Sequence, residues 1–239
     1  MDILTLDIKG VLLALLIALV MLYLGGPLLG SFYIFVMIYF LVLSAMVTHL
    51  GTKYKKKIRQ YQKTRGIKNV VANGLGPLIF VLLAHFQAFG LSGTVYTFTF
   101  MASVAAVTAD KFSSEIGVLD GEPTSIVTFK KVEKGTSGGV TLFGIGMGVF
   151  GAFLIAIVSA LVFFFFNPTL FNCSVGGCSS VPPLLLLLIA SAIVGGFVGT
   201  ISDSYLGYFE EKGIGNKYTS NFICSVAGAL VGFALVVLI

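Results

Sequence analysis

Two carboxylates stand out because they lie in or beside apolar stretches, where an ionisable group is costly and indicates function by default. Asp110 ends the stretch 91–109, and Asp203 lies inside a stretch that continues to Phe209. Hard divalent cations prefer oxygen ligands, so these residues predict a Mg²⁺ site that carries a nucleotide. The other oxygen-bearing side chains expected at the same depth are Ser113, Ser114, Glu115, Ser204, Asn73, Asn216 and Asn221.

Any one of these polar residues could instead be a helix cap. Caps need not all fall on one side of a membrane, however, and the expected helices place all of these residues on the same side. The shared side therefore favours a common site.

A glycine-rich turn ends the longest polar stretch, 111–139, and leads directly into an apolar stretch. Free backbone N–H groups and the positive end of a helix dipole make such a turn a natural phosphate site. The turn is not a Walker A motif, because no Gly-Lys-Ser/Thr closes it, and a simple turn is the alternative. The residues predicted to contact phosphate here are Gly135, Thr136, Ser137, Gly138, Gly139, Lys130 and Lys131, with Lys134 adding charge.

Membrane helices must position these residues. The chain has 239 residues, of which 57% are hydrophobic and only 10% are charged, against about 25% charged in a soluble domain. This composition excludes a soluble enzyme, a disordered chain and a secreted disulfide scaffold. We expect an all-α, polytopic membrane protein forming one domain over 1–239, with about seven spans. The expected spans are 8–24, 28–50, 70–89, 91–109, 140–166, 181–209 and 221–239.

The basic residues test this span count. Lys9, the eight bases of 53–68, Lys111, three lysines of 130–134, and Lys212 with Lys217 all fall on the side of the N-terminus. The positive-inside rule makes that side, and the predicted site, cytoplasmic. The net charge of +5 therefore indicates topology and anionic lipid head groups, not nucleic acid.

Other features have simpler explanations. Glycines four residues apart in the last three spans predict close helix packing, and Phe163–Phe166 is expected to face lipid. Cys173 and Cys178 lie in an expected outer loop, where a disulfide and two free thiols both remain open.

The motifs resemble an integral membrane family long known as a domain of unknown function, which includes the chloroplast phytyl-phosphate kinase and archaeal, bacterial and animal relatives. The resemblance covers nearly the whole chain after the second span. Lys111 departs from the usual threonine, and Glu133-Lys134 replaces a common Pro-Pro. The matching blocks are 66, 71–77, 106–110 with 113–117, 127–144, 202–207, 215–216 and 221.

The resemblance implies a kinase that transfers a phosphate from CTP, or another nucleoside triphosphate, to an isoprenoid monophosphate such as phytyl or geranylgeranyl phosphate. We expect Asp110 and Asp203 to hold Mg²⁺, with Glu115 as a further ligand or as the partner of a metal-bound water. The turn and its lysines would neutralise the triphosphate. Asn73, Asn216 and Asn221 would orient phosphate oxygens or the base.

Two other functions share these features. A cytidylyltransferase that makes a CDP-lipid would use the same Mg²⁺–CTP site. A transporter also contains buried carboxylates and broken helices, although here the acids lie at one surface and no inverted repeat is evident. A lipid-binding protein without catalysis has no obvious use for clustered acids. The sequence leaves the oligomeric state open.

Overall fold

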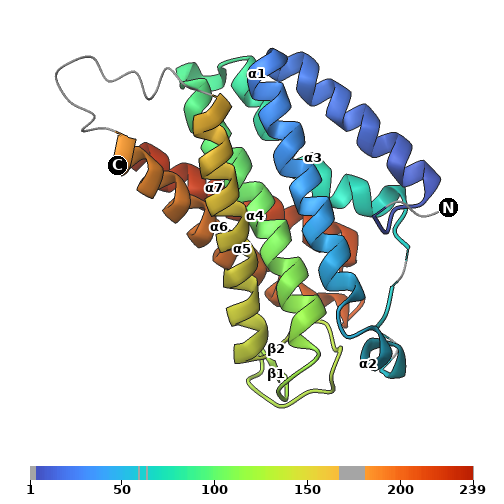
Figure 1. Ribbon diagram of the computed structural model, residues 1–239. Helices are drawn as coiled ribbons and strands as arrows, with labels where there is room; N and C mark the ends of the chain where they lie inside the picture. The colour runs from blue at the N-terminus through green and yellow to red at the C-terminus, as the bar shows by residue number, and fades with distance from the viewer. Residues whose placement is uncertain (1–3, 59, 63, 167–180, 239) are drawn as a thin grey trace.

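A computed structural model describes residues 4–58, 60–62, 64–166 and 181–238. These residues form a helical bundle with one small hairpin (Figure 1). The elements in chain order are α1 (Ile8–His49), α2 (Thr52–Lys57), α3 (Ile67–His85), the 3₁₀ helix η1 (Ala88–Gly90), α4 (Gly93–Gly117), β1 (Thr124–Ser125), β2 (Gly139–Val140), α5 (Leu142–Phe166), α6 (Val181–Glu210) and α7 (Lys217–Leu238). The expected all-α membrane fold is confirmed, and the loop that holds Cys173 and Cys178 lies outside the described residues.

Helix α1 contains the first two expected spans. Gly26 breaks its helical geometry with φ 68°, a conformation that glycine adopts easily. The chain turns back sharply there, so that the two halves form a V at the edge of the bundle (Figure 1). Gly30 packs so closely that an added Cβ would lie 2.7 Å from Leu22 Cα. The predicted break at Gly25-Gly26-Pro27 is therefore present as a kink inside α1.

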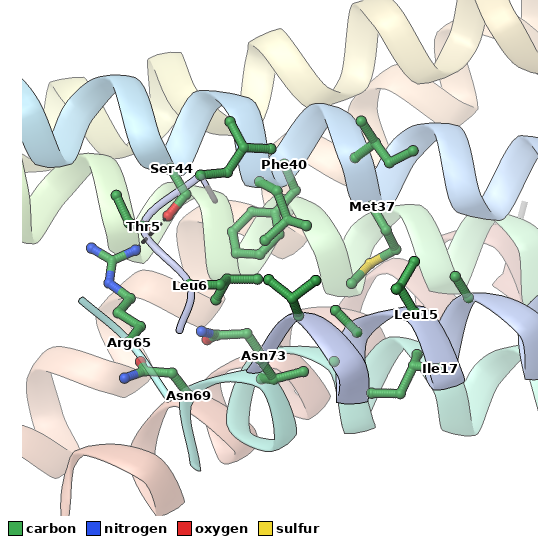
Figure 2. A pocket seen from close by; sticks show the side chains of 18 of the residues that line it. Thr5, Leu6, Leu15, Ile17, Met37, Phe40, Ser44, Arg65, Asn69 and Asn73 are labelled. Carbon is green, nitrogen blue, oxygen red and sulfur yellow. Dashed lines mark hydrogen bonds between the residues drawn. The ribbon is translucent and has the colours of Figure 1, made fainter. Parts of the chain in front are cut away.

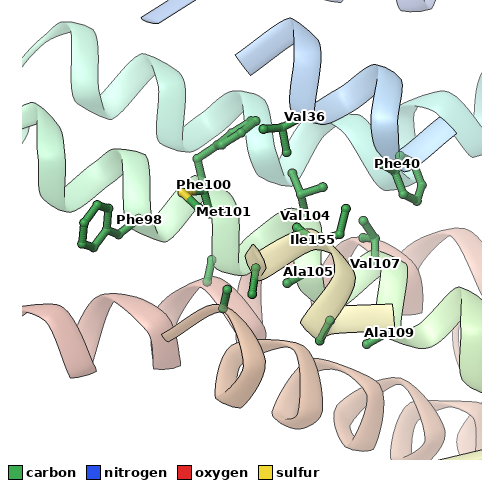
Figure 3. Close-up of a cluster of buried hydrophobic side chains, with 14 of the residues drawn as sticks. Val36, Phe40, Phe98, Phe100, Met101, Val104, Ala105, Val107, Ala109 and Ile155 are labelled. Carbon is green, nitrogen blue, oxygen red and sulfur yellow. The ribbon is translucent and has the colours of Figure 1, made fainter. Parts of the chain in front are cut away.

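Helix α4 is the centre of the bundle and packs against α1, α3, α5, α6 and α7. Figure 3 shows its buried side chains among those of neighbouring helices. Its alanines let α6 and α7 approach: an added Cβ on Gly199 or on Gly228 would lie 2.5 Å from Ala106 Cβ. The predicted glycine packing is confirmed.

Five of the described helices are long and apolar enough to cross a membrane, and α4 is not among them. Protein surrounds α4 on all sides, so its composition can be more polar than that of a lipid-facing helix. The five candidate spans are Ile8–His49, Ile67–His85, Leu142–Phe165, Leu184–Glu210 and Lys217–Leu238.

Two expectations need correction. Helix α4 does not end before Asp110 but continues to Gly117, because the polar residues after Asp110 pack against other helices rather than entering solvent. The loop that follows is correspondingly shorter and contains the paired strands β1 and β2. Phe163 and Phe164 are buried in the bundle, and in the described part of that run only Phe165 is exposed.

The polar segments meet at one end of the bundle. Gln60, just after α2, donates a hydrogen bond of 3.2 Å to the Gly135 carbonyl. The Ser137 N–H donates to Glu211 Oε1, just after α6, at 2.9 Å. Figure 1 shows α2, the hairpin and the first turns of α5 at this same end. The chain thus brings the glycine-rich turn to the ends of α4 and α6.

Candidate functional site

A polar cavity of about 170 Å³ lies between the C-terminal ends of α4 and α6 and the glycine-rich turn. Helix α4 presents Asp110, Ser113, Ser114 and Gly117 to it. Residues three, four and seven apart share one face of a helix, so extending α4 beyond Asp110 aligns these polar groups. Asp110 itself is buried, with only 8% of its surface exposed.

Helix α6 supplies the second carboxylate. Asp203, Ser204, Gly207 and Glu210 line the cavity from one face of this helix. Asp203 and Asp110 line the same cavity and lie close enough to interact electrostatically. In the part of the chain that the structure describes, the buried Oδ1 atom of Asp203 has no hydrogen-bond partner. A buried polar oxygen without a partner is costly, and a cation at this position would satisfy it.

The glycine-rich turn forms the opposite wall with all five of its predicted residues, 135–139. Gly138 has φ +77°, and an added Cβ would lie 2.6 Å from the Tyr208 backbone nitrogen. An added Cβ on Gly207 would lie 2.7 Å from the Gly138 nitrogen. Two glycines therefore permit backbone-to-backbone contact between the turn and α6. Thr141 accepts the Gly144 N–H at 2.9 Å and thereby caps α5.

Two lysines contribute positive charge to the cavity. Lys134 and Lys217 both line it, and Lys217 lies near enough to Asp203 to interact electrostatically. Asn221, four residues after Lys217, lines the same cavity and is buried. These groups suit an anionic ligand that carries a cation.

Glu115 lies on a different face of α4 from Asp110. Its carboxylate pairs with Lys55 at 2.8 Å, Arg65 at 2.9 Å and Lys111 at 3.0 Å. Burial lowers the pKa of the Arg65 guanidinium, and the Glu115 carboxylate opposes that shift. Within the described residues, no group of three or more His, Cys, Asp or Glu side chains is placed to hold a metal. The structure therefore brings Asp110 and Asp203 together, without Glu115.

Four other predicted residues lie outside the cavity lining. Lys130 and Lys131 are exposed, and Lys131 forms an ion pair with Glu122 that lowers the pKa of the glutamate. The Asn216 side chain accepts the backbone N–H groups of Tyr218 and Thr219, so it caps α7.

Asn73 is the fourth of these residues. Its Oδ1 accepts a hydrogen bond of 3.0 Å from Asn221 Nδ2. Asn73 therefore touches the site through Asn221 rather than lining it.

Gln60, Thr141, Glu210 and Lys217 line the cavity but were not predicted for the site, whereas Ser113 was expected at its depth without an assigned contact. Helical spacing is the signal that could have found Lys217, since it precedes Asn221 by four residues. Gln60 reaches the cavity only through the folding of a distant loop, which leaves no local signal.

The donor set fits a hard divalent cation. Two carboxylates supply part of an oxygen shell, and Mg²⁺ ordinarily completes its shell with water and substrate phosphates rather than with protein groups alone. Asp110 and Asp203 would hold the ion, which would neutralise charge on phosphate oxygens.

Comparison with known proteins gives several matches. The model of the family described as integral membrane protein DUF92 matches residues 3–236. An uncharacterized membrane protein of Methanocaldococcus jannaschii is 35% identical over 229 residues, which are 95% of this chain and 84% of that protein. No solved structure matches this chain.

Two proteins of Arabidopsis thaliana are also similar. Protein PGR is 36% identical over 129 residues, which are 54% of this chain and 39% of PGR. The chloroplastic protein VTE6 is 24% identical over 190 residues, which are 79% of this chain and 50% of VTE6. The matches thus span half or less of each plant protein.

Proposed function

Since this chain belongs to the integral membrane protein DUF92 family, we propose that it is a prenyl-phosphate kinase. It transfers the terminal phosphate of CTP, or of another nucleoside triphosphate, to an isoprenoid monophosphate and thereby forms the diphosphate. The observation that carries this proposal is the convergence of Asp110 and Asp203 on one cavity, with an Asp203 Oδ1 that is buried and has no hydrogen-bond partner among the described residues. The family resemblance of the motifs supports the class of substrate.

The chemistry needs positioning and charge neutralisation more than acid–base groups. An oxygen of the acceptor phosphate bonds to the terminal phosphorus of the donor, and the bond from that phosphorus to its bridging oxygen breaks. The nucleoside diphosphate leaves with the electron pair of the broken bond. A phosphate monoester has a second pKa near 6, so the acceptor is already ionised at neutral pH and requires no general base.

Different residues of the chain bind the cation, position the phosphates and neutralise their charge. Asp110 and Asp203 orient the divalent cation, which supplies charge neutralisation when bound. The turn places its backbone beside the phosphates, while Lys134 and Lys217 offset the remaining negative charge. Asn221 is placed to hydrogen bond to a phosphate oxygen or to the base.

The site belongs to the cytoplasmic side in this proposal. The base-rich segments near α2, the hairpin and the start of α7 adjoin the same end of the bundle as the cavity. The positive-inside rule assigns such an end to the cytoplasm, together with the N-terminus.

Product analysis tests the proposed reaction. Purified protein is incubated with Mg²⁺, radiolabelled CTP or ATP, and phytyl or geranylgeranyl monophosphate. The kinase releases a nucleoside diphosphate and a prenyl diphosphate in equal amounts. Release of pyrophosphate with a CDP-lipid would establish the cytidylyltransferase instead. Uptake of prenyl phosphate into proteoliposomes without nucleotide consumption would establish a transporter.

Gly138→Ala is expected to raise the KM for nucleotide at least about tenfold. The added methyl group meets the Tyr208 backbone nitrogen and pushes the turn away from α6, and a change of this size in binding corresponds to about 1.4 kcal/mol. Steady-state kinetics with varied nucleotide measure the effect.

Gly213→Ala is the matched control for this variant. Gly213 also has positive φ, at +79°, but an added Cβ there meets no described atom within 4 Å. It carries the same backbone penalty without the clash, so its KM should stay close to that of the unchanged protein. Equal KM values for both alanine variants would contradict the proposed role of the turn.

A further inference from the structure

A second cavity, of about 240 Å³, lies inside the V formed by the two halves of α1, closed on its third side by α3. We call it the α1 cavity. It is separate from the nucleotide site, and its walls are almost entirely hydrocarbon. The exposed residues Leu12, Leu16 and Leu19 lie on the first half of α1, so among the described residues this half of the helix separates the cavity from the lipid.

The polar groups of the α1 cavity gather at one end (Figure 2). Arg65, Ser44 and Asn69 lie together there, whereas Met37 and Ile17 lie toward the other end. Apolar walls with polar groups at one end match a molecule with a hydrocarbon chain and a polar head. A fully apolar ligand would leave the polar end unused.

Arg65 shows what kind of head group fits. Its side chain is buried, at 4% exposure, and lines the cavity. Its Nη1 donates to Ser44 at 2.7 Å, and its Nη2 reaches Glu115 at 2.9 Å. Its buried Nε has no hydrogen-bond partner among the described residues. A buried N–H donor without a partner is costly, and an anionic oxygen in the cavity would satisfy it.

The surrounding charge also favours an anion. Lys55, Arg65 and Lys111 all form their ion pairs with the single carboxylate of Glu115. Asp110 lies near enough to Arg65 and Lys111 to offset part of this charge. Buried cations in excess of their partners are costly, and a bound phosphate would reduce that cost.

The polar end of the α1 cavity adjoins the nucleotide site. Asn73 lines the α1 cavity, and Asn221 lines the nucleotide site. The two side chains are joined by the 3.0 Å hydrogen bond from Asn221 to Asn73. A head group at this end therefore adjoins the amide pair that separates the two cavities, and transfer requires this pair to part so that the acceptor phosphate reaches the terminal phosphorus of the donor.

We propose that the α1 cavity is the acceptor site, which holds the hydrocarbon chain of a single-chain lipid monophosphate between the halves of α1 and its phosphate beside Arg65 and Asn69. This inference rests on the proposed kinase activity for the identity of the lipid. It adds the location of the acceptor: the motif residues Asn73 and Gly74 line the α1 cavity, whereas the glycine-rich turn and the two aspartates line the other cavity.

Photolabelling tests the location without any turnover. The probe is geranylgeranyl monophosphate with a diazirine in its chain, added to the full-length protein in lipid nanodiscs without nucleotide, and labelled peptides are identified by mass spectrometry. We expect labels on residues 11–21 and 34–44. Unlabelled geranylgeranyl monophosphate should compete, whereas geranylgeraniol and inorganic phosphate should compete poorly. Labels confined to the groove between α6 and α7, or competition by geranylgeraniol as strong as by the phosphate, would overturn the proposal.

Ala18→Phe fills the α1 cavity, whose wall includes Ala18, and should lower specific labelling at least about tenfold. Its matched control is Ala227→Phe, which adds the same side chain in the shallow apolar groove between α6 and α7 and should leave labelling unchanged. The midpoint of thermal unfolding of each variant, compared with that of the unchanged protein, verifies that both variants are folded. Equal labelling of the two variants would overturn the proposal.

The same data separate this inference from the proposed function. Phosphoryl transfer accompanied by labels outside the α1 cavity overturns the acceptor site and leaves the kinase intact. Labels in the cavity without transfer to any prenyl phosphate support the lipid site and contradict the kinase.

Discussion

Asp203→Asn is expected to lower the rate of phosphoryl transfer at least about 1,000-fold, which corresponds to about 4 kcal/mol of transition-state stabilisation. The Asp203 carboxylate lines the same cavity as Asp110 and has one oxygen without a hydrogen-bond partner among the described residues, and an amide there is a poor ligand for a hard cation. Asparagine has nearly the same shape, so the fold should persist. Single-turnover assays with prenyl phosphate and labelled nucleotide measure the loss.

Asp120→Asn is the control for this variant. Asp120 is an exposed aspartate after α4 whose Oδ1 accepts only the neighbouring Gly121 N–H among the described hydrogen bonds. Its removal should leave the transfer rate unchanged. If Asp203→Asn retained full activity in a folded protein, the metal-binding role of the carboxylate pair would be wrong.

Glu115→Gln is expected to lower the free energy of unfolding by about 3–5 kcal/mol, the usual cost of removing one partner from a buried ion pair. Glu115 is the shared partner of Lys55, Arg65 and Lys111, and its loss leaves buried cations without compensation. Thermal unfolding in detergent measures the change: the folded fraction is recorded against temperature, and the midpoints of the variant and the unchanged protein are compared.

Glu122→Gln provides the comparison for this second variant. It breaks the exposed pair with Lys131, and exposed pairs contribute about 1 kcal/mol or less. A Glu115→Gln protein that is as stable as the Glu122→Gln protein but has lost magnesium dependence would restore Glu115 as a metal ligand and contradict the structural role assigned to it.

The sequence identified Asp110 and Asp203 correctly as neighbours because a carboxylate beside an apolar stretch is conspicuous wherever the helix goes. Glu115 could not be placed in the same way. The helix was expected to end before Asp110. Only the continuation of α4 to Gly117 determines which face of the helix carries Glu115. Five residues along a helix correspond to a rotation of about 140°, which turns Glu115 away from the face of Asp110.

The lysines near the turn illustrate a second limit. Lys130 and Lys131 lie close to the glycines in sequence but are exposed on the hairpin side, whereas Lys134 and the distant Lys217 line the cavity. The path of a polar loop depends on contacts such as that of Gln60 with Gly135, which involve residues far apart in the chain. The local spacing of residues therefore cannot predict these long-range contacts.

In the proposed function, α4 and α6 converge on a magnesium-bound triphosphate. Thermal unfolding of the purified protein with CTP, with Mg²⁺, and with both tests it most directly, because neither lipid nor turnover is needed. A ligand at 100 times its Kd stabilises a protein by about 2.7 kcal/mol, so both together should raise the Tm of the unchanged protein clearly, and that of Asp203→Asn hardly at all. No rise in the unchanged protein with either CTP or ATP, or an equal rise in both proteins, would contradict the claim.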